Sequence, residues 1–389
     1  MRFLCAVGDV TKIGTWSGTP YFMLAAGKAS GFLDGGMRLD VASAQGGRAL
    51  WNIGQLLRTG NFGGFQYSGR FLERLFDTGA SLPRDAEIIS FFPLLPPPGR
   101  HSGPFSLYID ATLKQNFEDY GIGKRVAAGF QANVLAREKA QYQRAERIVT
   151  MCRWAARSVV EDYGIGADKI HVVTPGANLD TEAVQTAAMQ GFDSDLKPLR
   201  LVFVGKDWRR KNLTFLFEIA DEARQRGIAI EVVVVGPREC ELPRHPALHS
   251  AGFIRKERDG DHFIATVTSA HFGCLFSHAE AAAMSKWEFL ALGVPFLGWD
   301  VGGLDDGMDE GLGHIFPAGA HACDVVDHLQ AFVASPDKYQ ALRQSAYGRR
   351  MAVTWPTALG RFDAIWDGDT QCQFQAAHGA VEERSGSCK

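Results

Sequence analysis

The stretch FGCLFSHAEAAAMSKWEFLALGVPFLGWDVGG, residues 272–303, decides the fold of this chain of 389 residues. It opens with a short apolar run, 272–277, of the length typical of a buried parallel strand. Helix-favouring residues follow over 281–292 and stop at a glycine. A second apolar run, 294–299, precedes the pair Gly302-Gly303. The stretch therefore predicts a strand, a loop, a helix and a second strand of an α/β fold.

The loop between the first strand and the helix is the predicted ligand site. Ligands of doubly wound sheets bind beyond the carboxyl ends of strands, where a helix points its free N–H groups outward. The small residues Ala281, Ala282 and Ala283 would let a diphosphate approach this backbone. Glu280 precedes the helix and Glu288 lies two turns inside it, so both carboxylates can accept hydrogen bonds from sugar or ribose hydroxyls in one cleft. Two solvated glutamates of a helix face are the alternative.

The pair Glu280 and Glu288, with its strand-loop-helix context and the Gly302-Gly303 pair downstream, resembles the E-x7-E motif of retaining GT-B glycosyltransferases of family 4, the group 1 glycosyl transferases. The resemblance covers residues 1 to about 366 and implies two Rossmann-like domains that face each other across a cleft. It assigns sugar hydroxyls to Glu280 and the ribose of a nucleotide to Glu288. Gly302-Gly303 would close that side of the cleft, with a backbone contact to the donor; a turn without a ligand is the alternative. Alanines stand where the family often has glycines after the first glutamate.

A second group of candidate residues follows the apolar run 199–205, a predicted strand. Lys206, Arg209, Arg210 and Lys211 come next, and cations at this place can bind a diphosphate and stabilise the charge on a leaving phosphate. The pattern resembles the family's G-R-x-x-x-x-K, with Lys206 in place of the arginine. A lysine supplies the charge without the planar fork of a guanidinium. A solvated basic turn is the alternative.

The first half of the chain has its own candidate loop after the predicted strand 3–7. Its residues Ser17 and Gly18 precede a proline that suits a helix start, so the backbone N–H groups of the loop can face an anion. The spacing differs from G-x-G-x-x-G, so a dinucleotide is not favoured. A crossover without a ligand is the alternative. Asp110, after the predicted strand 106–109, is a further catalytic candidate.

The length of the chain suits two domains. We expect an N-terminal acceptor-side domain over 1–180, a linker over 181–197 and a C-terminal donor domain over 198–350. A helix over 354–366 is expected to pack back on the first domain, and the polar residues 367–389 to form a disordered tail. Further strands are predicted over 87–92, 147–151, 170–173 and 228–235, and further helices over 124–147 and 213–227.

Charge and composition limit the partners. Hydrophobic residues make up 46% of the chain and the formal net charge is −3, so the protein reads as globular and not as a nucleic-acid binder. The seven cysteines are scattered, and no apolar run has the length of a signal peptide or a membrane helix. We therefore expect a cytoplasmic protein. The basic segment 124–147 leaves peripheral contact with the inner face of a membrane open, and a solvated helix face is the alternative.

The resemblance implies a retaining hexosyltransferase. The resemblance implies transfer from a nucleotide-diphosphate sugar to a hydroxyl of a glycan, lipid-linked or small-molecule acceptor, in cell-surface polysaccharide synthesis. It implies front-face attack, in which Lys206 and Lys211 stabilise the leaving diphosphate. No cofactor is expected. Asp193-Ser194-Asp195 imitates a D-x-D metal motif, but it lies in linker-like sequence before a strand and not after one, so no metal is expected. The alternatives are a catalytically silent GT-B partner or nucleotide-binding subunit, and a nucleotide-sugar epimerase on the same fold.

Overall fold

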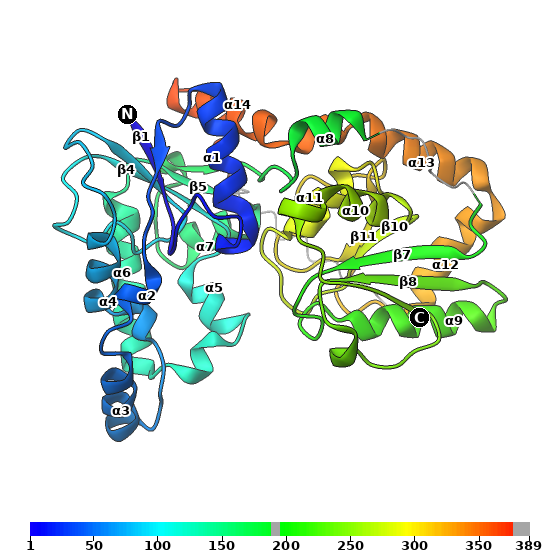
Figure 1. The fold of residues 1–389 in the computed structure, drawn as a ribbon, viewed down its shortest axis with the longest axis horizontal. Coiled ribbons are helices and arrows are strands. Elements are labelled where there is room, and N and C mark those ends of the chain that lie inside the picture. Colours follow the sequence, from blue (N-terminus) through cyan, green and yellow to red (C-terminus); the bar gives the residue numbers. More distant parts are fainter. Residues whose placement is uncertain (188–194, 376–389) are drawn as a thin grey trace, which may run out of the picture.

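The chain folds into two α/β halves that lie side by side (Figure 1). The structure is a computed structural model that describes residues 1–187 and 195–375. In each half, six strands form a sheet in which the neighbouring strands run parallel. The α/β fold predicted from the sequence is therefore confirmed.

The first sheet has the strand order β2-β1-β3-β4-β5-β6. The order reverses between β1 and β3, which are neighbours although β2 separates them in the chain. The strands are β1 Arg2–Cys5, β2 Gly35–Gly36, β3 Glu87–Ser90, β4 Phe105–Ile109, β5 Ile148–Thr150 and β6 Ile170–Val172. The α-helices of this half are α1 Thr19–Ser30, α2 Val41–Ala44, α3 Arg48–Thr59, α4 Gly69–Asp77, α5 Leu113–Glu118, α6 Ala128–Arg144 and α7 Arg153–Glu161.

The second sheet has the order β12-β11-β10-β7-β8-β9. Read from β9 to β12, with β7 counted as the first strand, the order is 3-2-1-4-5-6. This is the order of nucleotide-binding Rossmann folds, with the reversal between β7 and β10. The strands are β7 Leu199–Val204, β8 Ile230–Val235, β9 Leu248–Gly252, β10 Phe272–Leu275, β11 Phe296–Trp299 and β12 Gly313–Phe316. The helices are α9 Leu213–Gln225, α10 Lys256–Thr268, α11 Met284–Ala291, α12 Ala322–Ala334 and α13 Pro336–Gly348, with α8 Thr181–Thr186 before this half and α14 Trp355–Trp366 after it.

Short 3-10 helices complete the list of elements. They are η1 Thr15–Gly18, η2 Phe65–Tyr67, η3 Ile122–Arg125, η4 Ala167–Lys169, η5 Glu239–Glu241 and η6 Arg350–Val353. The predicted strands are all present with bounds that differ by one or two residues at either end, whereas β2, β9 and β12 were not predicted. These three strands lie at sheet edges and lack a continuous apolar run, which is the signal that marks a central parallel strand.

The start of α11 differs from the prediction. The helix was expected from residue 281 but begins at Met284, so Ala281 and Ala282 belong to the preceding loop. Ala283 has φ 44° and ψ 64°, a left-handed conformation that costs an L-residue roughly 1–2 kcal/mol. Trp287 of α11 donates a hydrogen bond from Nε1 to the carbonyl of Ala282 at 2.7 Å, which helps to hold this turn. The backbone geometry that delays the start of α11 is therefore set by tertiary contacts and not by helix propensity.

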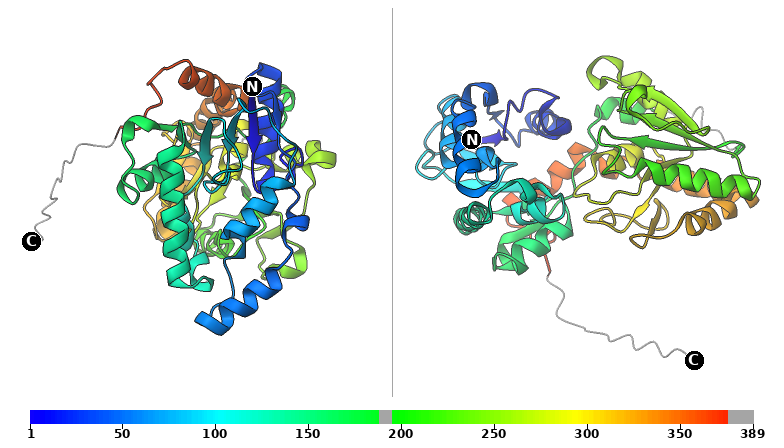
Figure 2. Two further views of the ribbon diagram at one scale, coloured as in Figure 1. Left: turned by 90° about the vertical axis from the view of Figure 1, so that its left-hand side faces the viewer. Right: turned by 90° about the horizontal axis from the view of Figure 1, so that it is seen from below.

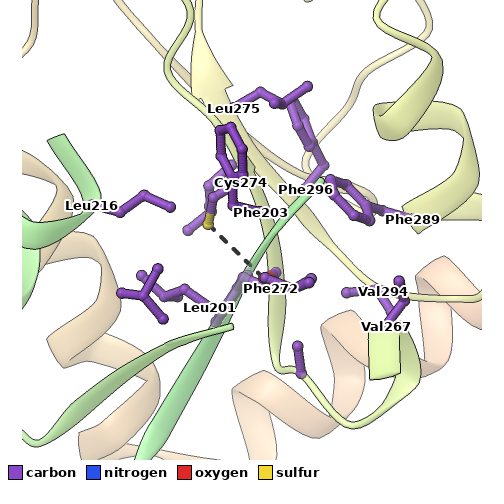
Figure 3. Packing of buried hydrophobic residues seen from close by; sticks show 14 of the residues in the cluster. Leu201, Phe203, Leu216, Val267, Phe272, Cys274, Leu275, Phe289, Val294 and Phe296 are labelled. Atoms are coloured by element: carbon purple, nitrogen blue, oxygen red, sulfur yellow. Dashed lines mark hydrogen bonds between the residues drawn. The ribbon is translucent and has the colours of Figure 1, made fainter. Parts of the chain in front are cut away.

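The core of the second half fixes α11 against the sheet (Figure 3). A Cβ atom on Gly273 of β10 would lie 2.2 Å from Cδ2 of Phe289 of α11, so only glycine permits this close approach. The rings of Phe289 and Phe296 stack at 6.4 Å between centroids, beside the buried Phe272 and Cys274. The loop that joins β10 to α11 thus has both of its ends held by the core.

The last helix, α14, returns to the first half, where it lies beside α1 in Figure 1. Its buried residues Trp355, Leu359 and Phe362 share a hydrophobic cluster with Leu4 of β1 and Tyr108 of β4. Together with α1, the helix covers one face of the first sheet.

Part of the predicted tail, 367–389, is ordered. Val172 of β6 donates a backbone hydrogen bond to Cys372, and Phe374 donates one to Ile170, each at 2.8 Å. Residues 367–375 therefore satisfy the free backbone groups of an edge strand, so disorder was the wrong expectation for them; residues 376–389 lie outside the described residues. In the predicted linker, 181–197, α8 comes first, while Asp193 and Ser194 also lie outside the described residues.

The close contact at Gly273 generates a stability prediction. Gly273→Ala should destabilise the fold by about 1–3 kcal/mol, because the added Cβ clashes with Phe289 in a packed core. The free energy of unfolding from urea titration measures the effect. Gly260→Ala in α10 is the control, since nothing lies within 4 Å of its added Cβ, and it should stabilise the helix slightly. Equal stability of the two variants would contradict the packing argument.

Candidate functional site

A pocket of about 620 Å³ lies between the two halves. The second half contributes the loop after β7 and the loop after β10, two neighbouring strands between which the strand order reverses. The first half contributes the loops after β1, β3 and β4, around its own reversal point. Both sheets therefore present to this cleft the edges at which α/β proteins bind ligands.

Glu280 is the most strongly engaged predicted residue of the pocket. Its Oε2 accepts hydrogen bonds from Lys211 Nζ at 2.9 Å, Arg210 Nη1 at 3.1 Å and Ser277 Oγ at 3.2 Å. Burial raises the pKa of this carboxyl, but the Lys211 and Arg210 charges outweigh burial and leave its pKa below the ordinary value. Glu280 is therefore an ionised acceptor near neutral pH, although only 8% of the residue is exposed.

Arg210 connects three parts of the site. Its Nη1 also donates to the carbonyl of Ala279 at 2.5 Å, and its own carbonyl accepts a hydrogen bond from the backbone of His278 at 2.9 Å. Its guanidinium lies 5.4 Å from the ring centroid of Tyr120, which belongs to the first half. Arg210 thus joins the two loops of the second half and reaches across the cleft.

The other predicted cations are placed differently. Lys206 lines the pocket, but its Nζ lies 4.6 Å from the ring centroid of Phe253, on another part of the wall than Lys211 with Glu280. Arg209 stacks on Trp208 and is not among the described residues that line the pocket. The basic loop therefore presents Lys206, Arg210 and Lys211 to the cleft.

Glu288 lies in α11, is 3% exposed and lines the same pocket as Glu280. It forms an ion pair with Lys256, the first residue of α10. Lys256 was not predicted, because a lone lysine in the first turn of a helix carries no signal of its own. The carboxylate of Glu288 is thus held by a cation that also faces the cleft.

The glycine-rich loop of the first half reaches the pocket through Ser17. Trp16, Ser17 and Gly18 have successive positive φ angles of 47°, 57° and 90°. Left-handed conformations of non-glycine residues cost about 1–3 kcal/mol and occur often at ligand sites. Asn178 holds the strained turn by donating to the carbonyl of Ser17 at 3.0 Å. Gly18 caps α1 and is not among the described residues of the pocket wall.

Asp110 follows β4 and lines the pocket from the first half. Burial raises the pKa of its carboxyl to about 6, backbone hydrogen bonds oppose that rise, and the Glu280 charge adds to it. The negative charges of Asp110 and Glu280 therefore repel each other across the cleft. Near neutral pH, Asp110 can accept a hydrogen bond in its ionised form and donate one in its protonated form.

The pair Gly302-Gly303 lies behind the Glu280 loop. A Cβ on Gly302 would stand 1.7 Å from the carbonyl oxygen of Glu280, and one on Gly303 would stand 2.5 Å from Cβ of Cys152 in the first half. Neither glycine is among the described residues of the pocket wall. The structure therefore gives the pair a packing role behind the loop, and its contact with the donor stays a prediction.

A buried ammonium group holds the segment after this pair. Lys286 of α11 is fully buried and donates to the carbonyls of Gly303, Leu304 and Asp306 at 3.3, 3.1 and 2.8 Å. Burial lowers the pKa of Lys286 to about 8. The Asp306 carboxylate accepts a 2.7 Å hydrogen bond from the backbone N–H of Arg153, at the start of α7 in the first half. The sequence analysis assigned no role to Lys286 or Asp306, whose partners are distant in the chain.

The described parts of the chain contain neither a cluster of metal ligands nor a membrane-spanning helix. Residues 1–187 and 195–375 contain no group of three or more His, Cys, Asp or Glu side chains arranged to hold a metal ion. In the same residues, no helix has the length and apolar character needed to cross a bilayer.

Sequence comparison places the chain near known glycosyltransferases. No model of a known protein family matches it. The D-inositol 3-phosphate glycosyltransferase of Nocardia farcinica is 28% identical over 249 residues, which are 59% of this chain and 55% of the relative. The enzyme of the same name from Gordonia bronchialis is 26% identical over 228 residues, 54% of this chain and 50% of the relative. The chain therefore spans little more than half the length of these curated relatives.

Solved structures resemble the whole described fold. Sucrose-phosphate synthase from Thermosynechococcus elongatus matches with a TM-score of 0.64 and 14% identity, covering 94% of this chain and 98% of that one. The lipopolysaccharide outer core galactosyltransferase WaaB in its apo form matches with a TM-score of 0.60 and 15% identity, covering 94% and 99%. The two facing Rossmann-like domains of the GT-B fold, predicted from the sequence, are thereby confirmed.

Gly302 allows a test of how the loop is positioned. Gly302→Ala should destabilise the protein by about 2–4 kcal/mol, because its φ of 62° disfavours alanine and its Cβ collides with the Glu280 carbonyl. Gly319→Ala is the control, since Gly319 also has a positive φ, of 79°, but open space around it, and should cost about 1 kcal/mol. Urea unfolding compares both variants with the wild type. Equal losses would contradict the collision.

Asp110 generates a pH prediction. The pKa of Asp110 is raised in the folded state. The contribution of Asp110 to the free energy of unfolding is therefore fully present below the unfolded pKa of about 4 and is lost as pH rises through about 6. Asp110→Asn should therefore be more stable than the wild type at pH 8, by about 1–3 kcal/mol, and equal to it at pH 4. Unfolding titrations at both pH values measure this. Asp261→Asn, at an exposed site, is the matched control, and equal behaviour of the two variants would contradict the assignment to Asp110.

Proposed function

We propose that this chain, which has the GT-B fold and is similar to the family 4 glycosyltransferases, is a retaining hexosyltransferase that uses a nucleotide-diphosphate sugar without a metal. The observation that carries the proposal is the ionised Glu280 held by Lys211 and Arg210, in a pocket that both domains line at the reversal points of their sheets. The names of the curated relatives support transfer of a sugar.

The donor is assigned to the second half. Lys206, Lys211 and Arg210 supply cationic charge for a diphosphate, and the backbone of Ala281, Ala282 and Ala283 lines the same wall. Glu288, fixed by Lys256, is assigned to the ribose hydroxyls of the nucleotide, because a buried carboxylate accepts hydrogen bonds and donates none. Glu280 is assigned to the sugar hydroxyls.

The reaction then needs no protein nucleophile. The acceptor hydroxyl attacks the anomeric carbon on the face from which the diphosphate leaves, so one C–O bond forms as the other breaks. The leaving diphosphate takes the hydroxyl proton, while Lys211 and Lys206 stabilise its charge. On the facing wall, Asp110 and Ser17 of the first half are assigned to the acceptor side.

The acceptor is proposed as a glycan, a lipid-linked sugar or a small polyol, and the site of action as the cytoplasm in cell-surface glycan synthesis. The names of similar proteins support this range, since they include transferases for D-inositol 3-phosphate and for the lipopolysaccharide outer core.

A catalytically silent, nucleotide-binding GT-B protein is the second candidate. It is favoured by Ala283, whose left-handed backbone occupies a place where the family often has glycine. An epimerase on the same fold would convert the donor sugar without any acceptor. Product analysis with and without acceptor separates these activities.

The experiment is calorimetric binding of UDP, GDP and ADP and of their hexose conjugates, without added metal, followed by transfer assays with the nucleotide that binds. Glu288→Gln should weaken nucleotide binding by about tenfold, because it removes a charged acceptor for the ribose. Glu280→Gln should leave nucleotide affinity nearly unchanged and lower kcat by about a hundredfold.

Glu310→Gln, at an exposed site, is the matched control and should change neither quantity. Equal nucleotide affinity in wild type and Glu288→Gln would contradict the ribose assignment. Binding of a nucleotide without turnover of any donor would support the silent protein, and absence of all binding would refute the donor site.

A further inference from the structure

The helix α3 presents its apolar face to solvent. Leu50, Ile53 and Leu57 are 77%, 55% and 82% exposed, and at 100° per residue they fall on one side of the helix. Leu56 beside them is 50% exposed. An amphipathic helix of a globular protein normally buries such a face, whereas α3 has no buried residue. A contiguous exposed patch of this kind marks an interaction surface.

The helix is fixed in this orientation from its other side. The Nε1 of Trp51 donates to the carbonyl of Gly63 at 3.2 Å, and the ring of Trp51 lies 5.2 Å from that of Phe130 at the start of α6. Figures 1 and 2 show α3 projecting from the first half as an outlying helix. The packing of Trp51 therefore keeps the apolar face of α3 turned toward solvent.

The patch lies in a segment of the chain that carries only positive charge, between Asp40 and Glu73. Residues 41–72 contain three arginines, Arg48, Arg58 and Arg70, all exposed, and no aspartate or glutamate. The exposed Phe62 extends the apolar surface toward η3, because the neighbouring Gly63 lies against the backbone of Arg125. Lys124 and Arg125 are exposed there.

The basic segment 124–147, where the sequence left membrane contact open, contributes little else to this surface. Arg137 donates to the carbonyl of Tyr67 at 2.6 Å, and Arg144 donates to the side chain of Gln141 at 2.7 Å. These two cations are engaged within the first half, whereas Lys124 and Arg125 lie next to the α3 region.

We propose that α3, together with Phe62 and the flanking cations, docks this protein on an anionic lipid bilayer. Leucine and isoleucine side chains of such a helix enter the boundary between headgroups and acyl chains, while arginines and lysines bind the acidic headgroups. A protein partner would need acidic groups around an apolar groove to match the same charge pattern. The proposal goes beyond the proposed function and does not rest on it.

The test is co-sedimentation of the full chain with vesicles of phosphatidylcholine, with and without about 30% phosphatidylglycerol. The wild type should bind the anionic vesicles, and binding should fall as salt rises. Leu50→Ser with Leu57→Ser should lower the apparent affinity about tenfold or more. Arg48→Gln with Arg58→Gln should lower it and reduce its dependence on salt.

Arg244→Gln with Lys338→Gln, two exposed sites of the second domain, is the charge-matched control and should bind as the wild type does. Thermal unfolding should be unchanged in all variants, since the replaced side chains are exposed. Absence of wild-type binding, or equal binding by the double serine variant, would overturn the proposal. So would a wild-type dimer in light scattering that the serine substitutions dissociate, because a second copy would then cover the patch.

Discussion

The site depends on the burial of one carboxylate. Taking a charged group out of water costs several kcal/mol unless hydrogen bonds and opposite charge offset the loss. Glu280 has both, from Lys211, Arg210 and Ser277. Because Glu280 follows β10 while the two cations follow β7, the ion pairs hold together two loops that are far apart in the chain but come from neighbouring strands. The geometry of the pocket wall thus follows from sheet topology combined with charge neutralisation.

A second buried charge supports the first from behind. The ammonium group of Lys286 donates hydrogen bonds to three carbonyls of residues 303–306. The preceding Gly302 packs against the carbonyl of Glu280. The same segment carries Asp306, whose carboxylate accepts hydrogen bonds from the first turn of α7 in the other half. The loop that presents Glu280 is therefore supported by contacts that reach the facing domain, and its position is sensitive to how the two halves sit together.

The sequence was informative where local patterns are strong. Continuous apolar runs identified the central strands, and the charged residues at their carboxyl ends, Glu280 and Lys211 among them, meet in the cleft as expected. Features set by tertiary contacts were not predictable: the ion pair of Glu288 with Lys256, the left-handed Ala283 that delays α11, and the placement of Gly302 behind the loop. The sequence predicts a tail for residues 367–375, because pairing with an edge strand leaves no apolar signature.

The position of α14 determines how the chain can be divided into fragments that keep a complete core. The helix follows the whole second half in sequence, yet its side chains complete the core beside Leu4 and Tyr108. A fragment that ended at residue 187 would expose this apolar face to water and would be prone to aggregate. Chimeras that exchange the second half between related proteins should therefore keep two crossover points, so that the first half retains its own C-terminal helix.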